Sequence, residues 1–500
     1  MPAEQPVVAV DRARHKRLAA ELPDVALLIG DDAIKRGGAG EHLHVNPATG
    51  SAQAAVPLAG VDDVDRAVAA ARAAFPAWRA WRPDHRRDAL LRLGSLIRRH
   101  ADEIARILVL EAGTPLSGAA AMPSRAADYL EYYAGLADKT EGRVVPIFPE
   151  RAFDYTLPEP YGVVAVLSTW NGGISAVARK AGAALAAGNT VVVKPMELAP
   201  FSTHVFGLLA REAGIPPGVV NTLPGGADAG AALAAHPDVD KISFTGGPDT
   251  ARKVLIAAAA AITPVVLELG GKSGDIVFPD ADLAAAGAFA GAACMRNSGQ
   301  GCVMPTRLIV QRSVHDETVE RAVAAIRAMP IGDPLDERTQ IGPVVTEAHA
   351  ERITAMVDDA RRHGVGELLI GGGRCDGPLA EGAFVPPAVL DHVPPAADIA
   401  QREVFGPVLT VHPFDDEDEA VALANATPYG LAGYVHTRDL HRAHRVAAAL
   451  DAGYVSLNGF AALPAAAPFG GFGGSGYGKE GGRAGLEEFV RTKNVYLPLG

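Results

Sequence analysis

The chain has 500 residues, of which 48% are hydrophobic and 21% are charged. This composition is typical of a folded globular protein and excludes a mostly disordered chain. The formal net charge is −12, so we expect no broad basic face for nucleic acid or for an anionic membrane surface. The sequence has no run of about 18 apolar residues, and we therefore expect no membrane span.

The first sixty residues predict an extended segment with turns at Asn46-Pro47 and Thr49-Gly50. Asp62 and Asp63 occupy the place of a helix N-cap, before an apolar-periodic stretch. A second helix is predicted from about Asp88, with Gly113 as its end.

From Gly162 onward, short apolar runs alternate with helical stretches. The runs follow one another five times in about 110 residues, and each is apolar enough to be a parallel strand buried on both faces. This pattern predicts an α/β fold with a doubly wound parallel sheet. A second α/β unit is predicted after Gly270-Gly271. The predicted strands are residues 162–168, 190–194, 219–223, 241–244 and 264–269, and then 274–278, 306–310, 408–411 and 453–457.

The chain has three cysteines, Cys294, Cys302 and Cys375, which are too few for a disulfide framework. No pair of cysteines or histidines has the spacing of a zinc site, so we expect no metal. The N-terminus carries charges where a signal peptide needs an apolar run. These features favour a reducing, cytoplasmic location.

Cys302 is the first candidate for chemistry, because Gly299 and Gly301 leave room for a substrate carbonyl to approach it. A thiolate is a strong nucleophile once it is activated. The alternative is an ordinary buried cysteine, which by itself is the commoner case and is our interpretation of Cys294 and Cys375.

Glu268 ends an apolar strand, where partial burial would raise its pKa and allow it to act as a general base. The alternative is an ion pair with Lys272. Asn171 follows another strand and precedes a helix, where its amide could donate to a developing oxyanion. The alternative, a helix N-cap, is favoured by that position alone.

Lys194 and Glu197 follow a strand and could hold ribose hydroxyls, or they could form a solvated turn. Residues Phe244–Gly247 also follow a strand and precede a helix, whose N-terminus could take a phosphate. The GxGxxG pattern of the classical dinucleotide-binding fold is missing, so this phosphate site is weak evidence by itself.

Together and in this order, the motifs resemble the NAD(P)-dependent aldehyde dehydrogenase superfamily over nearly the whole chain. The two most specific motifs are LELGGKS at residues 267–273 and GQGC at residues 299–302. Supporting motifs are TWN at 169–171, FTGG at 244–247, EVFGPV at 403–408 and PFGGFGGSGYGKE at 468–480.

The resemblance implies that Cys302 attacks an aldehyde and that the side chain of Asn171 and the Cys302 backbone N–H hold the oxyanion. It also implies that Glu268 activates the water that hydrolyses the resulting thioester, so that a free acid rather than an acyl-coenzyme A is formed. Glu480 matches a family position associated with proton handling. A carboxylate at Glu197 would repel a 2′-phosphate, which favours NAD, with NADP as the second choice.

The resemblance further assigns residues to the cofactor and to the substrate. The implied cofactor-binding residues are Thr169, Trp170, Lys194, Glu197, Gly226, Gly230, Phe244, Thr245, Gly246, Gly247, Leu269, Gly270, Glu403 and Phe405. The implied substrate residues are Gly172, Ala176, Arg179, Gly301 and Leu463.

The sequence departs from the family pattern at several of these positions. Thr169 stands where proline is usual, and Gly172-Gly173 replaces Phe-Pro, which puts the shape of the substrate tunnel in doubt. Small residues there, with Ala461 and Ala462, predict a roomy tunnel unless neighbouring side chains fill it. The phosphate-loop serine is Gly247, the next helix has Ala251 in place of glycine, and Gly473 replaces a lysine.

Arg179 resembles an arginine of succinate-semialdehyde and hydroxyaldehyde dehydrogenases, where it can hold a substrate carboxylate or hydroxyl. The alternative is an ion pair between Arg179 and an acidic neighbour. Two other activities remain as alternatives: a non-catalytic, crystallin-like scaffold, which the presence of both nucleophile and base disfavours, and a thiol hydrolase acting on esters.

The resemblance implies three structural parts and a homodimer or homotetramer. The expected parts are an NAD-binding domain (1–138 and 161–268), a catalytic domain (269–483) and an oligomerisation element (139–160 and 484–500).

Overall fold

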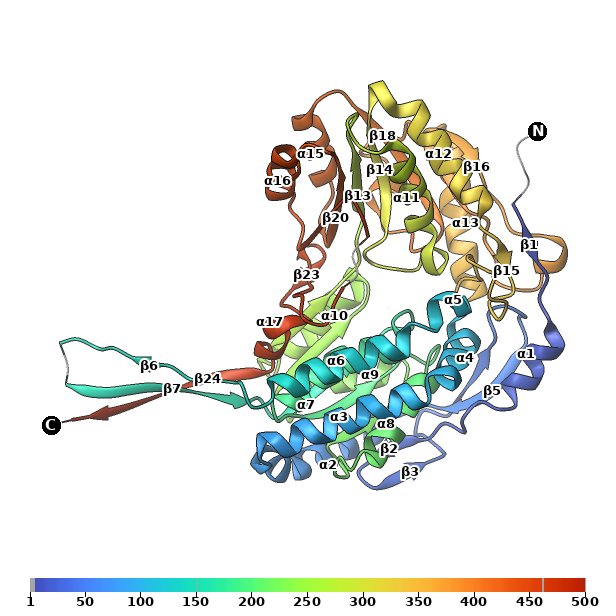
Figure 1. Cartoon of the computed structure of the whole chain (residues 1–500). Coiled ribbons are helices and arrows are strands. Elements are labelled where there is room, and N and C mark those ends of the chain that lie inside the picture. Colours follow the sequence, from blue (N-terminus) through green and yellow to red (C-terminus); the bar gives the residue numbers. More distant parts are fainter. Residues whose placement is uncertain (1–4, 150, 461–462, 500) are drawn as a thin grey trace.

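The computed structural model describes residues 5–149, 151–460 and 463–499. It has two α/β lobes and a long arm that projects from them (Figure 1). Ala461 and Ala462, two of the residues predicted to open the substrate tunnel, lie outside the described residues. None of the described helices has both the length and the apolar composition to span a membrane.

The first lobe contains an eight-stranded sheet whose middle is parallel, as the five apolar runs predict. Because these strands are buried on both faces, most of their residues are apolar, and several of the polar ones are buried as well. Their order is β12-β11-β8-β9-β10, and β2 (Leu27–Ile29), β3 (Asp32–Ile34) and β23 (Gly476–Tyr477) add antiparallel edges. The parallel strands are β8 (Val163–Leu167), β9 (Thr190–Lys194), β10 (Val220–Thr222), β11 (Lys241–Thr245) and β12 (Val265–Glu268).

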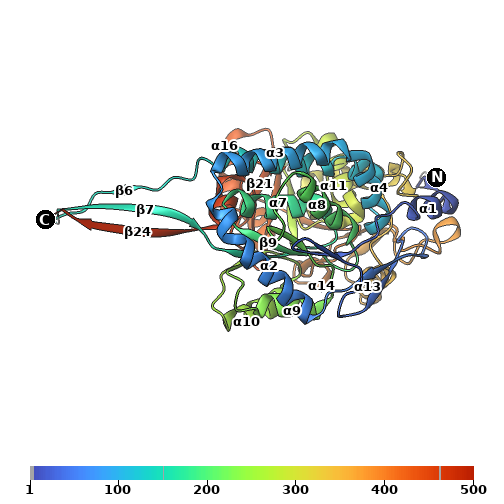
Figure 2. The ribbon, with the colours of Figure 1, turned by 90° about the horizontal axis from the view of Figure 1, so that it is seen from below.

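Helices cover both faces of this sheet (Figure 2). Alternate strand residues face opposite sides: Val164 and Val166 pack into one core, whereas Val163 and Ala165 pack into the other. The first core is shared with α3 (Pro83–Arg99), α4 (Ala101–Ala112), α6 (Met122–Leu136), α7 (Gly173–Ala186) and α8 (Phe201–Glu212), and the second with α2 (Val61–Ala80), α9 (Ala227–Ala235) and α10 (Pro248–Ala259).

The structure corrects two predicted helix starts. The N-cap of α2 is Gly60 rather than Asp62 or Asp63, because the Asp63 carboxylate accepts the Gly60 N–H at 3.0 Å from the third helical position. Helix α3 begins at Pro83, five residues before the predicted start, since proline at the first turn suits its fixed φ. Gly113 ends α4 in the left-handed conformation (φ 72°), as predicted, but the single predicted helix is two helices, because α3 ends at Arg99 and α4 begins at Ala101.

The second lobe contains a seven-stranded sheet, parallel except at the β16 edge. The four predicted strands of this lobe are β13, β14, β18 and β21. Together with the helices, the two sheets confirm the predicted α/β class. In spatial order the strands are β16 (Glu367–Ile370), β17 (Ala388–Asp391), β18 (Val408–Phe414), β14 (Pro305–Gln311), β13 (Ser273–Val277), β20 (Ala432–His436) and β21 (Tyr454–Leu457). The main helices of this lobe are α11 (Leu283–Met295), α12 (His315–Ala328), α13 (Glu347–Arg362), α15 (Glu417–Asn425) and α16 (Leu440–Ala449).

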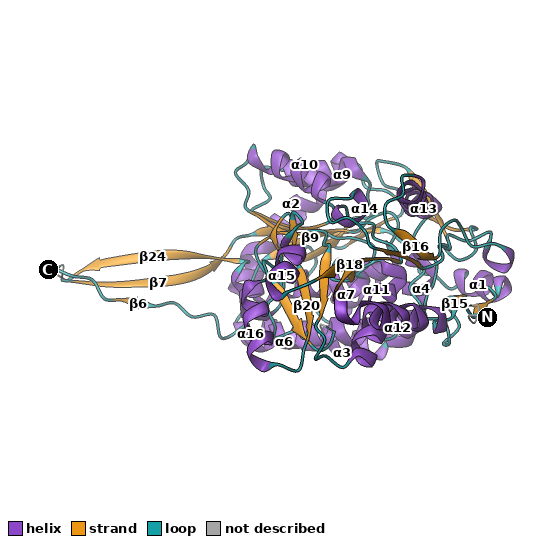
Figure 3. Ribbon diagram, turned by 90° about the horizontal axis from the view of Figure 1, so that it is seen from above, coloured by secondary structure: helices purple, strands orange, loops and turns teal. Residues whose placement is uncertain are grey.

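The arm is a three-stranded antiparallel ribbon, and it stands clear of both lobes (Figure 3). Its strands are β6 (Val144–Val145), β7 (Ala152–Pro160) and β24 (Val490–Pro498). β7 and β24 pair over nine residues, although they come from opposite ends of the chain. The arm exposes Phe153 and Leu497, each at 43% or more, which is a large apolar surface for so thin an element.

Two short strands each pair with a strand of the other predicted domain. β23, which falls within the predicted catalytic domain, pairs with β12 of the first sheet. β1 (Val7–Val8), which falls within the predicted NAD-binding domain, pairs with β15 (Ile331–Gly332). The two lobes are therefore linked by exchanged strands as well as by the chain at Gly270-Gly271.

Candidate active site

One cavity of about 1310 Å³ lies between the two lobes. It is lined by the carboxyl ends of the parallel strands of the first sheet and by the segment before Cys302. In a doubly wound sheet this edge is where ligands bind. All nineteen residues predicted to bind the cofactor or the substrate line the cavity, and so do Cys302 and Asn171. Glu268 and Glu480 are buried beside it rather than in its wall.

The two glycines of the LELGGKS motif bring the lobes together at Cys302. A Cβ at Gly271 would lie 2.3 Å from the Cys302 carbonyl oxygen. A Cβ at Gly270 would lie 2.2 Å from the Glu403 carboxylate, which accepts the Gly271 N–H at 3.0 Å. A side chain is excluded at Gly271 because the backbone of Cys302 lies there, whereas at Gly270 the neighbour is the end of the Glu403 side chain.

Cys302 is half-buried and lines the cavity. Burial, with smaller contributions from Glu403 and Glu268, raises the pKa of its thiol to about 12. The thiol is therefore protonated at neutral pH and requires a base before it can attack a carbonyl. Cys294 is fully buried, and its pKa is likewise raised to about 12 by burial, which fits the predicted ordinary buried cysteine.

The loop before Cys302 is held in an unusual conformation. Asn297 (φ 49°) and Ser298 (φ 56°) both have left-handed backbones, which are rare for residues other than glycine. The side chain of Gln300 fixes this loop: its Nε2 donates to the Asn297 carbonyl at 3.1 Å, and its Oε1 accepts the Val345 N–H at 2.9 Å. Such local strain is common where a loop must present a reactive group.

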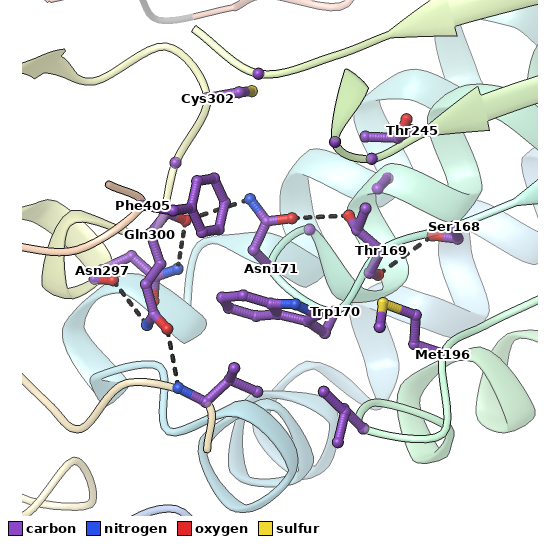
Figure 4. A pocket seen from close by; sticks show the side chains of 18 of the residues that line it. Ser168, Thr169, Trp170, Asn171, Met196, Thr245, Asn297, Gln300, Cys302 and Phe405 are labelled. Carbon is purple, nitrogen blue, oxygen red and sulfur yellow. Dashed lines mark hydrogen bonds between the residues drawn. The ribbon is translucent and has the colours of Figure 1, made fainter. Parts of the chain in front are cut away.

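Asn171 does not cap a helix. The N-cap of α7 is Gly172, and it has no side-chain hydrogen bond. Instead, the Asn171 Nδ2 donates to the Gln300 carbonyl at 3.2 Å, and its Oδ1 accepts the Thr169 hydroxyl at 2.7 Å (Figure 4). These two bonds fix the orientation of the amide and point its NH₂ group at the loop that carries Cys302. The amide NH₂ keeps a second N–H for another acceptor.

Glu268 ends β12 with only 2% of its surface exposed. Neither of its carboxylate oxygens has a hydrogen-bond partner among the described residues. Burial, followed by the charge of Glu480, raises its pKa well above the usual value. The predicted alternative, an ion pair with Lys272, does not form, since the buried Lys272 ammonium also lacks a partner in the described part of the chain.

Glu480 forms a buried ion pair with two cations. It contacts Arg179 Nε at 2.5 Å and also contacts the ammonium of Lys180. Burial raises the pKa of Glu480, but the two cations outweigh this effect and hold the pKa below its usual value. Arg179 thus has the acidic neighbour that the sequence left as one alternative.

The other half of the cavity offers the groups that a dinucleotide needs. Lys194 Nζ donates to the Gly225 carbonyl at 2.5 Å, and burial lowers its pKa to about 8, so it is not part of a solvated turn. Glu197 lines the cavity beside it. The N-terminus of α10 opens into the cavity at Gly247, where an added Cβ would meet nothing within 4 Å. The buried Thr245 hydroxyl has no partner within the described residues. These donors and this open helix end fit an adenosine ribose and a pyrophosphate.

The structure also reveals residues that the sequence analysis missed. Gln300 lies inside the GQGC motif, which was the available signal. Ser475 likewise lies inside the PFGGFGGSGYGKE motif. Its hydroxyl donates to the Gly270 carbonyl at 2.7 Å and accepts the Gly430 N–H at 3.0 Å, which joins the glycine-rich tail to both lobes. Two residues that the sequence did predict, Trp170 and Phe405, pack edge-to-face, with ring centroids 5.4 Å apart.

One group of side chains with metal-binding chemistry exists among the described residues, outside the cavity. It comprises His315, Asp391 and His392. Both ring nitrogens of His315 already contact carboxylates, Asp391 at 2.9 Å and Asp316 at 2.8 Å. These contacts occupy the His315 ring, and the cluster lies away from the cavity.

Comparison with known sequences decides the family. The model of the Aldehyde dehydrogenase family matches residues 36–495. The chain belongs to this family. Solved structures agree: the chain is 36% identical to an NAD-dependent aldehyde dehydrogenase from Sinorhizobium meliloti, with a TM-score of 0.95 over 99% of this chain and 98% of that one.

Other structures are similar to a comparable degree. Two structures of PnpE, one from Pseudomonas sp. WBC-3 and one in complex with nicotinamide adenine dinucleotide, are each 38% identical to the chain, with TM-scores of 0.93 over 95% of this chain and 98% of that one. An NADP-dependent enzyme from E. coli is 36% identical, with a TM-score of 0.93 over 96% and 99%. The chain is therefore an NAD(P)-dependent aldehyde dehydrogenase by family, and its general reaction is the oxidation of an aldehyde.

Proposed function

We propose that this aldehyde dehydrogenase oxidises its substrate to a free carboxylic acid, with Cys302 as nucleophile and Glu268 as the base that activates water. The observation that carries the proposal is the arrangement around Cys302. Cys302 lines the cavity, and the oriented Asn171 amide faces the loop that carries it. The Glu268 carboxyl, which has no partner among the described residues, lies close enough to raise the pKa of the Cys302 thiol.

In the first step, the Cys302 thiol gives its proton to solvent water and its sulfur bonds to the aldehyde carbon, which gives a thiohemiacetal. The carbonyl oxygen gains negative charge, and two donors are available to it. These are the second N–H of Asn171 and the Cys302 N–H, which makes no backbone hydrogen bond among the described residues. NAD, when bound, would supply the hydride acceptor that the oxidation of the Cys302 thiohemiacetal to a thioester requires.

In the second step, Glu268 takes a proton from water, whose oxygen bonds to the thioester carbon, and the Cys302 sulfur leaves. A buried carboxyl with a raised pKa and no fixed partner is suited to this exchange of protons. The acid is then released and the thiol is restored.

For the cofactor, we propose NAD as the main substrate and NADP as a weaker one. Lys194 and Glu197 would hold the adenosine ribose, the N-terminus of α10 would hold the pyrophosphate, and Glu403 with Phe405 would hold the nicotinamide end. Glu197 supports NAD because its carboxylate accepts from a ribose hydroxyl but repels a 2′-phosphate.

Two further proposals concern assembly and cellular location. The exposed apolar side chains of the arm support a homodimer or homotetramer in which the arm is covered, with the domain boundaries given above. The three unpaired cysteines support a reducing compartment such as the cytoplasm.

The alternatives fit the site less well. A non-catalytic scaffold would not need an oriented amide or an unpartnered buried carboxyl. A semialdehyde dehydrogenase that uses Arg179 for the substrate carboxylate would have to displace Glu480 from that arginine. An esterase activity of Cys302 is expected only as a side reaction.

The proposal is tested by following absorbance at 340 nm with NAD and with NADP over a panel of aldehydes. Wild type is expected to form NADH with a higher kcat/KM than NADPH, and Cys302→Ala is expected to form neither. Equal activity of wild type and Cys302→Ala would contradict the mechanism.

A further inference from the structure

A cluster of ionisable side chains lies in the second lobe, where α12 begins and β17 ends. His315 is the first residue of α12, Asp391 is the last residue of β17, and His392 follows it. One ligand atom from each of the three residues lies within 4.8 Å of the other two. Sequence spacing gives no sign of this cluster, because 76 residues separate His315 from Asp391. His315 and Asp391 are buried, whereas the His392 side chain is 57% exposed, so solvent reaches the cluster from one side.

The His315 ring lies between two carboxylates. Its Nδ1 is 2.8 Å from Asp316 Oδ1, and its Nε2 is 2.9 Å from Asp391 Oδ1. A neutral imidazole carries a single N–H and can donate to only one of these oxygens. At the other nitrogen a lone pair faces a carboxylate oxygen, which is repulsive unless a positive charge lies between them. That charge is either a second proton or a metal ion.

The two carboxylates have no strong cation beside them. Among the described residues, the ion-pair partners of Asp391 are His315 and His392, and the partner of Asp316 is His315. Neither carboxylate contacts a lysine or an arginine in that part of the chain. With both imidazoles neutral, the cluster carries two negative charges and presents ring nitrogens as ligands, which favours a divalent cation.

The spacing of the donor atoms is close to that of a metal site. Zinc ligands lie about 2.0–2.1 Å from the ion at the corners of a tetrahedron, which places neighbouring ligand atoms about 3.3 Å apart. His315 Nε2 is 2.9 Å from Asp391 Oδ1, and His392 Nδ1 is 3.2 Å from Asp391 Oδ2. A metal-bound histidine usually donates its other N–H to a carboxylate, and Asp316 occupies that place beside His315 Nδ1.

We propose that His315 Nε2, His392 Nδ1 and the Asp391 carboxylate bind one divalent ion with the ligand preferences of zinc. Water from the exposed side supplies the fourth ligand. Two imidazoles and one carboxylate suit Zn²⁺, whereas Mg²⁺ and Ca²⁺ prefer oxygen ligands throughout. None of the three residues lines the cavity. The ion therefore joins the start of α12 to the end of β17 and takes no part in aldehyde oxidation.

The test is a calorimetric titration of the chain with Zn²⁺, without NAD. Wild type is expected to bind one ion at this site with a dissociation constant of about 10 μM or tighter. His392→Gly removes one ligand at a left-handed position (φ 51°) that glycine adopts readily, and it is expected to abolish this binding. Asp316→Asn keeps all three ligands and is expected to weaken binding by about tenfold. Zn²⁺ is expected to raise the thermal unfolding midpoint of wild type but not of His392→Gly.

Two controls separate this site from other zinc ligands. His363→Gln removes an exposed histidine that contacts one carboxylate, Asp359 at 3.4 Å, and it is expected to bind Zn²⁺ as wild type does. Co²⁺ in place of Zn²⁺ is expected to give visible bands of imidazole and carboxylate ligation, without the near-ultraviolet band of a cobalt thiolate. No binding by wild type, undiminished binding by His392→Gly, or a thiolate band that disappears in Cys302→Ala would each overturn the inference.

Discussion

Replacing Gly271 with alanine places one methyl group between the two lobes at Cys302. The added Cβ would lie 2.3 Å from the Cys302 carbonyl oxygen and 3.3 Å from the Leu431 Cβ. An ordinary contact for a Cβ begins at about 3.4 Å, so the backbone at Cys302 has to move by roughly 1 Å. This backbone belongs to the loop that Gln300 and Asn171 hold in place, and it cannot move without disturbing them.

A displacement of about 1 Å at a reacting group costs roughly a hundredfold in rate. We therefore expect Gly271→Ala to lower kcat by about that factor, and overpacking to lower the free energy of unfolding by about 1–3 kcal/mol. The neighbouring change Gly270→Ala makes a useful contrast. Its Cβ meets the end of the Glu403 side chain, which can swing away, so we expect a higher KM for NAD and a smaller change in kcat.

The assay is the steady-state formation of NADH at 340 nm, with thermal unfolding measured on the same samples. Gly135→Ala on α6 is the control, because its added Cβ would meet nothing within 4 Å, and it is expected to behave as wild type. If Gly271→Ala kept kcat within twofold of wild type, the close approach of the two backbones would not control the position of Cys302, and the reasoning would be refuted.

Three further predictions concern the surroundings of Cys302. Because its pKa is raised to about 12, alkylation of Cys302 by iodoacetamide, followed by peptide mass spectrometry, is expected to speed up about tenfold per pH unit from pH 7 to 9.5; a flat profile above pH 8 would argue against it. Thr169→Val frees the Asn171 amide and is expected to lower kcat by about fivefold, whereas Thr169→Ser restores it; equal rates for all three would count against the orienting bond. Glu480→Gln leaves two buried cations unpaired and is expected to lower the free energy of unfolding in urea by about 3 kcal/mol or more. The folded-state pKa of Glu480 is depressed, so the ion pair stabilises the wild type fully above about pH 5. The difference in free energy of unfolding between wild type and Glu480→Gln is expected to shrink as the pH falls through that pKa. A difference independent of pH would contradict the ion pair.

The strands of the first sheet could be predicted from sequence because burial on both faces favours short runs in which most residues are apolar. Helix starts were harder to place, since Asp63 serves the α2 N-terminus from inside the helix rather than from its cap. The motifs led to the cavity residues because the chemistry of the site depends on short segments whose order along the chain is visible in the sequence.

The partners of individual side chains could not be predicted in this way. Asn171 follows a strand and precedes a helix, which favoured an N-cap, but its partners are Thr169 and a loop about 130 residues further along the chain. Lys272 follows Glu268 by only four residues, yet Glu268 ends β12 of the first sheet and Lys272 directly precedes β13 of the second. Arg179 meets Glu480 about three hundred residues away, and only the folded structure reveals that contact.

The most direct test of the central claim is a single-turnover experiment on Glu268→Gln. Mixed with NAD and an aldehyde, this variant is expected to release one equivalent of NADH per site and then stop. Intact-protein mass spectrometry is expected to find the acyl group on Cys302, because the water that should release it is not activated. Continuous turnover by Glu268→Gln with no acyl group on Cys302 would contradict the assignment of nucleophile and base.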